Sequence, residues 1–594
     1  MKKVKKAYAR SDERNKIQNI LAICVVIFTV AFIPIIVRLK IFEDPANTLP
    51  DAYDFFAFWK SWALYITAIA ALIPLFIALK NFLFNKKQEA IISIISKEKR
   101  IFLILTGLYL AACLFSTILS KNISIALFGY RCQSEGFFTI ASVFIITACG
   151  MLFIKGCKIN LIYKAIYISA GIIFIIGIFQ FIGLDPFKAD LIKSIIIPGK
   201  YGDLANSILF PDNPSSSFRN SIYSTLYNSN VFGTYAALIM VFSMSRAIYS
   251  ADKKHRMFSL FIMSLALFTL INCFSRGAYL GAAFGSIVIA LMTLKRIKNY
   301  YKSIIPVAII IVLVIIAAAL IGKGKVFERL STVDIDTQDA ATGVTERISD
   351  FSLINNKLIL FFNKRSLNIE KRGNDLVFSD TEGREMTIDY SPEDEGYKIN
   401  KDNYRDFIVF ADRENLFVKK KNALLRFIIR DDGFILADAA GKEAKISGPQ
   451  SGVFTGRERF ASGRGYIWSR TIPLIKKNIV VGSGPDTFYY AFPQDDYQGK
   501  LKFMYNAYIN IDMAHNIFLQ KAIETGGFSM IIFVIIIIWM LLSAFRKSSA
   551  LMLAITVVYC VCGLFTDENI CTMIVFWPLI GIEFANLYSS DGSE

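Results

Sequence analysis

Apolar residues fall along this chain in blocks of about twenty, separated by short polar segments. A helix needs about 20 apolar residues to cross a bilayer, whereas the core of a soluble protein uses shorter alternations. The blocks lie near residues 17–38, 61–84, 101–120, 136–154, 160–183, 229–249, 257–274, 278–294, 303–322, 515–545, 549–566 and 570–588. The pattern predicts an all-α polytopic membrane protein with about twelve transmembrane helices. We expect the first block to be a span, because it is too long for a signal-peptide core.

Basic residues cluster in the short connections that follow alternate blocks, as in SADKKHR (250–256), LKRIKNYYK (294–302) and FRKSS (545–549). The positive-inside rule makes such connections cytoplasmic, so both termini are predicted to be cytoplasmic. The net charge of +18 is then a topology signal, and we expect the partner to be the lipid bilayer and not nucleic acid.

The opposite face carries the unusual segments, including a loop at 184–228 and a long stretch between the ninth and tenth spans. Strand-like alternation and turn signals such as RDDG and AAGK predict a small extracytoplasmic β-rich insertion at about 352–448. An amphipathic helix is predicted near 466–477. The predicted divisions are residues 1–327 (nine helices), 328–460 (the segment with the insertion) and 461–594 (the amphipathic segment and the last three helices).

The chain has only two histidines, and they are predicted to lie on opposite faces. His255 sits in a basic cytoplasmic connection. His515, in DMAHNIFLQ, begins the tenth apolar run on the outer face, where a helix N-terminus disfavours the imidazolium. A neutral imidazole there suits a general base. The alternative is an interfacial histidine that is hydrogen-bonded to a neighbouring backbone group.

Two arginines on the outer face are candidates for binding phosphate oxygens. Arg276, in FSRGAY, lies between two spans with almost no loop, and its alternative role is a snorkelling helix anchor. Arg464, in SGRG, is flanked by glycines that permit close backbone approach. Spacing alone does not distinguish it from the other arginines nearby, which are Arg457, Arg459 and Arg470.

A third outer pair is Arg131 with Glu135 in GYRCQSEG, and an interfacial salt bridge is the simpler interpretation of it. Two guanidinium groups and one neutral base fit a diphosphate leaving group and a hydroxyl nucleophile, a chemistry that needs no metal.

The sequence offers little sign of a metal site or a disulfide framework. The nine cysteines lie mostly in apolar stretches without metal-ligand spacing. Asp486, Asp495 and Asp496 keep a divalent-metal site open as an alternative. We expect no cofactor and no metal.

An ordered set of motifs gives a specific resemblance. The set comprises NSNVFGTYAAL (228–238), FSRGAYLG (274–281), SGRGYIW (462–468), GSGPDTF (482–488) and AHNIFLQKAIETGG (514–527). In this order it resembles the O-antigen ligase and O-antigen polymerase (Wzy-type) superfamily of bacterial envelope proteins, and GPDTFYYAFPQDDY (484–497) resembles the Gram-positive version. The resemblance covers nearly all of the membrane part, and we expect the β insertion to lie outside it.

The resemblance implies a GT-C type glycosyltransferase in the bacterial cytoplasmic membrane with its active site on the outer face. It would transfer a glycan from an undecaprenyl-diphosphate-linked donor to an acceptor hydroxyl, inverting the anomeric centre without a metal. His515 of the HN motif would be the base, and Arg276 and Arg464 would hold the diphosphate. Asn516, Arg131 and Glu135 are possible accessory residues.

The acceptor stays open among glycan, lipid and protein hydroxyls. A composition heavy in Lys, Ile and Asn favours a Gram-positive source, and hence a surface-polysaccharide polymerase or ligase. Two other classes remain: a lipid-linked glycan flippase or transporter, and a non-catalytic envelope assembly factor that uses the β insertion for binding. A transporter is expected to carry its charges inside the bundle, whereas here they gather on one face.

Overall fold

The computed structural model describes residues 16–42, 52–84, 95–154, 156–202, 222–294, 297–321, 347–412, 414–421 and 423–588. The helices of this part of the chain are Lys16–Ile35, α2 (Phe58–Phe84), α4 (Lys97–Ile118), α5 (Ile123–Phe128), α6 (Phe137–Phe153), α7 (Ile159–Phe181), α8 (Asp190–Ile196), α10 (Ser229–Tyr249), α11 (Lys253–Asn272), α12 (Arg276–Leu294), α13 (Ile297–Ile321), α16 (Arg464–Ile475), α17 (Phe488–Ala491), α18 (Tyr497–Met504), α19 (Ile517–Glu524), α20 (Gly527–Arg546), α21 (Ala550–Gly563) and α22 (Ile570–Leu587).

Within the described residues, ten helices have the length and hydropathy needed to cross a bilayer, and α6 and α21 are shorter apolar helices at two further predicted spans. The chain is a multi-pass membrane protein. The burial of its helices follows from their place in the bundle: 94% of the apolar window of α10 is buried, against 11% for α13. Because an apolar surface as exposed as that of α13 is tolerated only against lipid, α13 lies at the periphery and α10 at the centre.

The tenth predicted run is not one helix, which corrects the expected span of 515–545. The chain breaks between α19 and α20, where Gly526 adopts a φ of +101°. An L side chain rarely adopts this conformation, so the glycine pair in ETGG ends one helix and starts another. His515 therefore precedes a short helix and not a membrane span.

The β-rich region consists of two antiparallel sheets that form a sandwich. One sheet has the order β3-β4-β5-β6-β7 and the other β13-β12-β11-β10-β9-β8. The strands are β3 (Ile348–Ile354), β4 (Lys357–Phe362), β5 (Arg365–Arg372), β6 (Asp375–Ser379), β7 (Glu385–Met386), β8 (Ile388–Ser391), β9 (Gly396–Ile399), β10 (Phe407–Ala411), β11 (Asn415–Lys420), β12 (Ala423–Arg430) and β13 (Gly433–Leu436). Alternate residues point into a shared apolar core, where Phe351 packs edge-on against Phe427.

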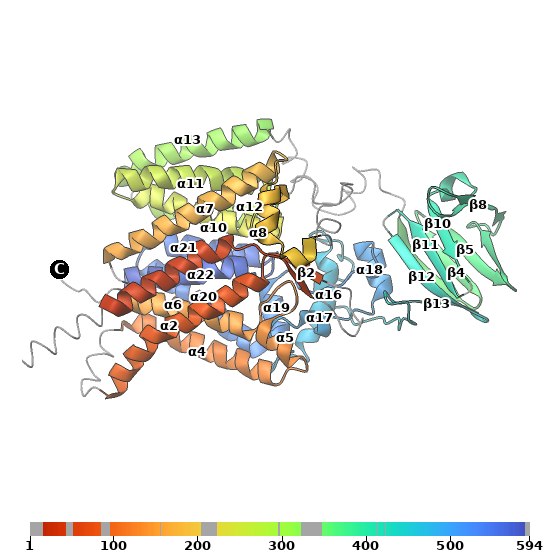
Figure 1. Ribbon diagram of the computed structural model, residues 1–594, viewed down its shortest axis with the longest axis horizontal. Helices are drawn as coiled ribbons and strands as arrows, with labels where there is room; N and C mark the ends of the chain where they lie inside the picture. Colours follow the sequence, from red (N-terminus) through yellow and green to blue (C-terminus); the bar gives the residue numbers. More distant parts are fainter. Residues whose placement is uncertain are drawn as a thin grey trace, which may run out of the picture.

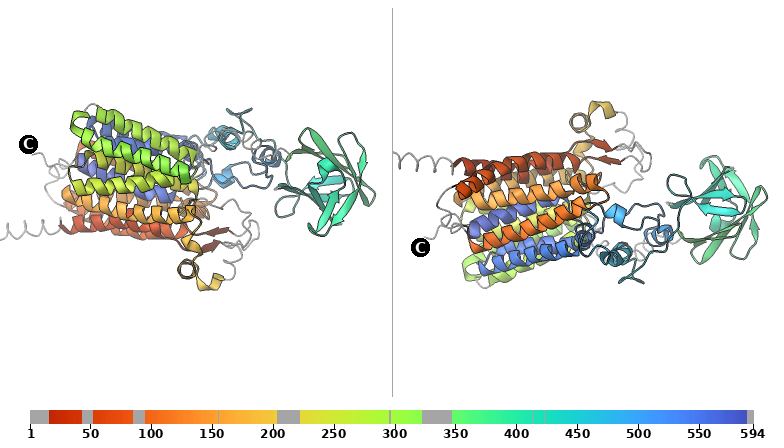
Figure 2. Two further views of the ribbon diagram at one scale, coloured as in Figure 1. Left: turned by 90° about the horizontal axis from the view of Figure 1, so that it is seen from above. Right: turned by 90° about the horizontal axis from the view of Figure 1, so that it is seen from below.

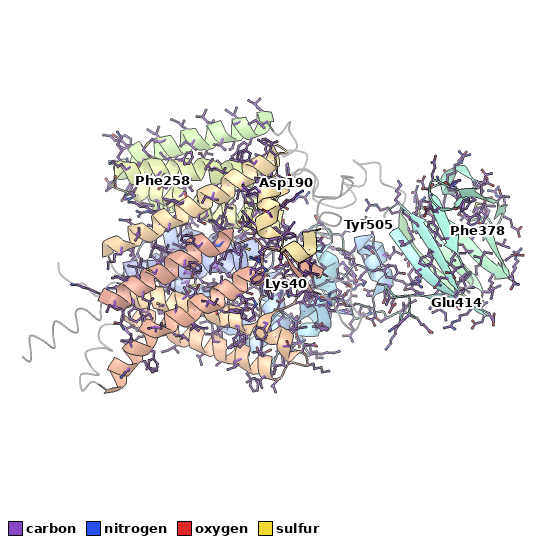
Figure 3. The ribbon with its side chains drawn as sticks, in the orientation of Figure 1. Lys40, Asp190, Phe258, Phe378, Glu414 and Tyr505 are labelled. Carbon is purple, nitrogen blue, oxygen red and sulfur yellow. The ribbon has the colours of Figure 1, made fainter. Side chains whose placement is uncertain are left out.

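The sandwich lies at one end of the helix bundle, and α16, α17 and α18 lie between the two (Figures 1 and 2). Tyr505, which follows α18, occupies this connecting region (Figure 3). A small hairpin of β1 (Lys40–Phe42) and β2 (Ala52–Asp54) lies at the same end of the bundle. The predicted site residues are carried by elements at this end.

Candidate functional site

His515 is held by the carboxylate of Asp567 through two contacts. The backbone N–H of His515 donates to Oδ1 of Asp567 at 2.6 Å, and Nδ1 of the imidazole lies 2.7 Å from Oδ2. The imidazole side chain keeps 38% of its surface exposed, whereas that of Asp567 keeps 12%. With Nδ1–H donated to the carboxylate, Nε2 carries the lone pair and is the atom able to accept a proton.

The backbone around His515 is fixed by its neighbours. His515 has a φ of +51°, which is uncommon for a residue with a side chain. The next residue, Asn516, caps α19 by accepting the N–H groups of Phe518 and Leu519, and donates its own amide to the carbonyl of Leu564 at 3.2 Å. In the HN motif, the asparagine caps α19 and binds the end of α21, and the histidine directly precedes this cap.

Sequence reasoning missed Asp567, which adds a carboxylate to the surroundings of His515. The expected neutral imidazole rested on the dipole of a helix beginning at His515, but the N-cap is Asn516 and the ring faces a carboxylate. That carboxylate stabilises the imidazolium that forms when Nε2 takes a proton. The sequence feature that could have revealed Asp567 is the polar stretch TDEN (566–569) between two apolar blocks.

Close packing of α12 on α21 brings Arg276 to the same place. A Cβ built on Gly281 would lie 2.4 Å from Sγ of Cys562, and one on Gly277 would lie 3.1 Å from Cβ of Phe565. At Gly281 the approach requires glycine, and at Gly277 a side chain would be tightly packed. Since Arg276 precedes Gly277 and Phe565 lies two residues before Asp567, the packing sets the first turn of α12 beside the loop that carries the carboxylate.

Arg464 begins α16 after an unusual backbone turn. Ala461, Ser462 and Gly463 all have positive φ angles, of 51°, 61° and 86°. A Cβ on Gly465 would lie 2.1 Å from the carbonyl oxygen of Arg457, so the second glycine of SGRG is required by close approach. Nη1 of Arg464 donates to the carbonyl of Ala461 at 3.0 Å, whereas its buried Nε has no hydrogen-bond partner among the described residues.

The charges of Asp567 and Arg276 both affect the pKa of Arg464. Burial lowers the pKa of its guanidinium, the negative charge of Asp567 opposes this change, and the positive charge of Arg276 adds to it. An arginine remains charged at neutral pH in spite of such shifts. The imidazole, the carboxylate and the two guanidinium groups therefore form one electrostatic cluster.

Two of the other arginines near Arg464 have different environments. Arg470 pairs with Asp496 (Nε to Oδ2, 3.1 Å) and with Glu458 (3.7 Å). Arg459 lies 5.9 Å from the ring centroid of Tyr505. The charge of Asp567 thus acts on Arg464, while Arg470 serves the contact between α16 and α18.

Glu135 and Asp486 support the loop that contains Arg131. Oδ2 of Asp486 accepts the backbone N–H groups of Tyr130 at 2.6 Å and of Glu135 at 2.8 Å. The carboxylate of Glu135 accepts the N–H of Ile570 in the first turn of α22 at 3.3 Å. Burial raises the pKa of both carboxyls well above the ordinary value; the negative charge of Asp486 adds to the change at Glu135, and that of Glu524 adds to the change at Asp486.

The acids considered for a metal have other contacts. Asp486 holds the Tyr130–Glu135 loop, and Asp496 binds Arg470, the Tyr466 hydroxyl and the N–H of Gly499. Within the described ranges, no group of three or more His, Cys, Asp or Glu side chains is arranged to hold a metal ion.

A buried ion pair fixes α19 to the loop after α21. Lys521 pairs with Glu568 and donates to the hydroxyl of Tyr109 at 2.9 Å, and Glu568 also accepts from Tyr559 and Trp577. Nearby, burial raises the pKa of Glu524 to about 7. Because Glu568 follows Asp567, this network holds the carboxylate in place beneath the imidazole.

The fold and the cluster define a multi-pass membrane protein with an acid–base pair and two guanidinium groups gathered at one end of the bundle. Residues 423–534 match the family model of the O-antigen ligase (Wzy_C), and this match confirms the resemblance to the O-antigen ligase and polymerase superfamily. The match includes Arg464 and His515. It begins in β12, so the last two strands of the sandwich lie inside it, contrary to our expectation for the β insertion. No curated protein and no solved structure matches the chain.

Proposed function

We propose that this protein is a GT-C type membrane glycosyltransferase that transfers or polymerises a glycan from an undecaprenyl-diphosphate-linked donor onto an acceptor hydroxyl at the outer face of the bacterial cytoplasmic membrane. The observation that carries the proposal is the His515–Asp567 pair beside two guanidinium groups, in a membrane protein that matches the O-antigen ligase family. The long segment between α13 and α16 then stands outside the cell, and both termini lie inside.

His515 acts as the general base. Its Nδ1–H donates to Asp567, so Nε2 takes the proton of the acceptor hydroxyl as the oxygen attacks the anomeric carbon of the donor sugar. The bond between this carbon and the diphosphate oxygen breaks on the opposite side, which inverts the centre. The imidazolium, stabilised by the carboxylate, then loses its proton to water.

Arg464 and Arg276 hold the leaving diphosphate. Their positive charges act on each other, an arrangement that costs free energy in the empty site and favours a dianionic ligand between them. The buried Nε of Arg464, without a partner among the described residues, is available as a donor to a phosphate oxygen. Charge developing on the diphosphate is thereby stabilised without a metal.

The experiment is transfer by the purified full-length enzyme with a native lipid-linked donor, read by the mass of the product. We expect His515→Ala and Arg276→Ala each to abolish transfer while the protein still inserts and folds, with His255→Ala, in the first turn of α11, as the matched control. Full activity of His515→Ala would remove the base assignment. A ladder of products indicates a polymerase, and a single addition indicates a ligase.

The assignment of a metal-free reaction has its own test. We expect turnover to be unchanged in the presence of a chelator, and a loss that magnesium rescues would refute the assignment. Movement of labelled lipid-linked glycan across proteoliposomes without a change in its mass would instead identify a flippase, and binding without either activity would identify an assembly factor.

A further inference from the structure

Hydrogen bonds join three segments beside His515, one of which is far from the other two in the sequence. The first is the loop 127–136, whose Tyr130 and Glu135 N–H groups bind Asp486. The second is the segment 486–494, and the third is 511–515. Gln494 joins the last two: its amide donates to the carbonyls of Tyr489 at 3.0 Å and Ile511 at 2.6 Å, and its Oε1 accepts the Ile511 N–H at 3.2 Å.

These hydrogen bonds bring three tyrosine rings together. Tyr130 and Tyr489 are stacked, with centroids 5.3 Å apart and planes inclined by 14°. Tyr490 stands nearly perpendicular to both, at 6.2 Å from Tyr130 and 5.1 Å from Tyr489. Tyr490 is 44% exposed and the other two are half-buried, so the group reaches the surface.

Polar groups border the rings on the side of the proposed base. Asp512, three residues before His515, is a charged neighbour of Tyr130 and Tyr489, and burial raises the pKa of its carboxyl. Gln133 lies close enough to lower that pKa, yet its buried Nε2 makes no hydrogen bond of good geometry within the described residues. Arg131 adds a positive charge beside the same two tyrosines.

We propose that Tyr130, Tyr489 and Tyr490, together with Asp512 and Gln133, form the subsite for the sugar ring that carries the acceptor hydroxyl. An aromatic ring packs against the apolar C–H face of a pyranose, and carboxylate and carboxamide groups bind the hydroxyls at its edge. Gln494 holds Ile511 beside the tyrosine segment, and Asp512 and His515 follow Ile511 in the chain, so the platform adjoins the segment that carries the proposed base. The inference rests on the proposed glycosyl transfer and deepens it, because it makes the acceptor a glycan and not a protein or a bare lipid.

The probe is one glycan repeat unit released from the native lipid-linked donor by mild acid. Binding of this free repeat unit to the purified full-length protein is measured by calorimetry, and transfer kinetics are measured in parallel. For Tyr489→Ala we expect the affinity for the repeat unit to fall about tenfold, and the KM for the acceptor to rise by a similar factor, with the KM for the donor unchanged. Tyr489→Phe restores both, because stacking does not need the hydroxyl. Tyr390→Ala, an exposed tyrosine on β8, is the matched control.

The two hypotheses fail separately. A wild-type protein that transfers glycan while Tyr489→Ala keeps normal acceptor affinity and KM would overturn the subsite. A wild-type protein that binds the repeat unit through these tyrosines but transfers nothing would refute the proposed function and leave the subsite standing. If Tyr489→Ala does not fold, Tyr490→Ala, at the more exposed ring, decides the question by the same measurements.

Discussion

The substitution Asp567→Asn tests the acid–base pair with almost no change of shape. Both carboxylate oxygens are in use: Oδ1 accepts the backbone N–H of His515, and Oδ2 faces Nδ1. In asparagine one of these atoms becomes an NH2 group. The backbone N–H can only donate, so the amide oxygen must stay with it, and the NH2 must then donate to Nδ1. The imidazole proton moves to Nε2, and no base faces the acceptor.

The size of the effect follows from this tautomer switch. General-base catalysis contributes about 10²- to 10⁴-fold, and a carboxylate-to-amide change that traps the wrong tautomer removes about 10⁴-fold in serine proteases. The stabilisation of the imidazolium by the carboxylate is lost at the same time. We therefore expect kcat to fall by about 10³-fold or more, with the KM for the donor nearly unchanged.

The assay is initial-rate transfer by purified enzyme in detergent or nanodiscs, with the fold checked by thermal unfolding. The matched control is Asp495→Asn, an acid between α17 and α18, which we expect to retain wild-type turnover. Asp567→Ala frees Nδ1 to regain its proton, so it is expected to be no more damaging to kcat than the isosteric asparagine. Retention of more than about a tenth of wild-type kcat in Asp567→Asn would refute the reasoning.

Two further predictions concern the supports of the site. Gly465→Ala places a Cβ 2.1 Å from the Arg457 carbonyl oxygen. We therefore expect this substitution to lower the free energy of unfolding by about 1–3 kcal/mol in a denaturant titration and to raise the KM for the donor. Gly448→Ala, whose Cβ would meet nothing within 4 Å, is expected to change neither quantity. Burial raises the pKa of Glu524 from 4.5 to about 7, so its protonated form favours the fold and stability falls as pH rises through this window. The slope of the free energy of unfolding against pH is measured by SDS titration. Glu524→Gln is expected to reduce this slope by up to about 1.4 kcal/mol per pH unit, and an unchanged slope would contradict the assignment.

The helices were predictable because each apolar block is long and its limits are marked by basic or turn residues. The prediction failed where one block holds two helices: Gly526 and Gly527 interrupt the run 515–545 without making it polar, so hydropathy alone passes over the break. The strands were predictable because one face of each sheet is solvated, as the alternating burial of β11 illustrates.

The site was predictable only in part. His515, Arg276 and Arg464 stood out as polar residues in short motifs at the ends of apolar runs. Asp567 did not, because its role depends on the start of α19 meeting the end of α21, where a Cβ added to Gly563 would lie 2.7 Å from Ile517. Such a contact between distant segments leaves no periodicity in the sequence. The three tyrosines were missed for the same reason, since Tyr130 and Tyr489 become neighbours only through Asp486 and Gln494.

A buried ion pair contributes to the connection between the sandwich and the proposed donor site. Arg464 begins α16, and Arg470 in the same helix pairs with Asp496, the N-cap of α18. Leu501 of α18 is in turn buried in the core of the sandwich. The side chains of Arg470 and Asp496 are 11% and 5% exposed, so separating them would remove the shorter of the two ion pairs of Arg470 and leave it only Glu458. The ion pair therefore joins α18, which is anchored in the sandwich, to α16, the helix that begins with Arg464.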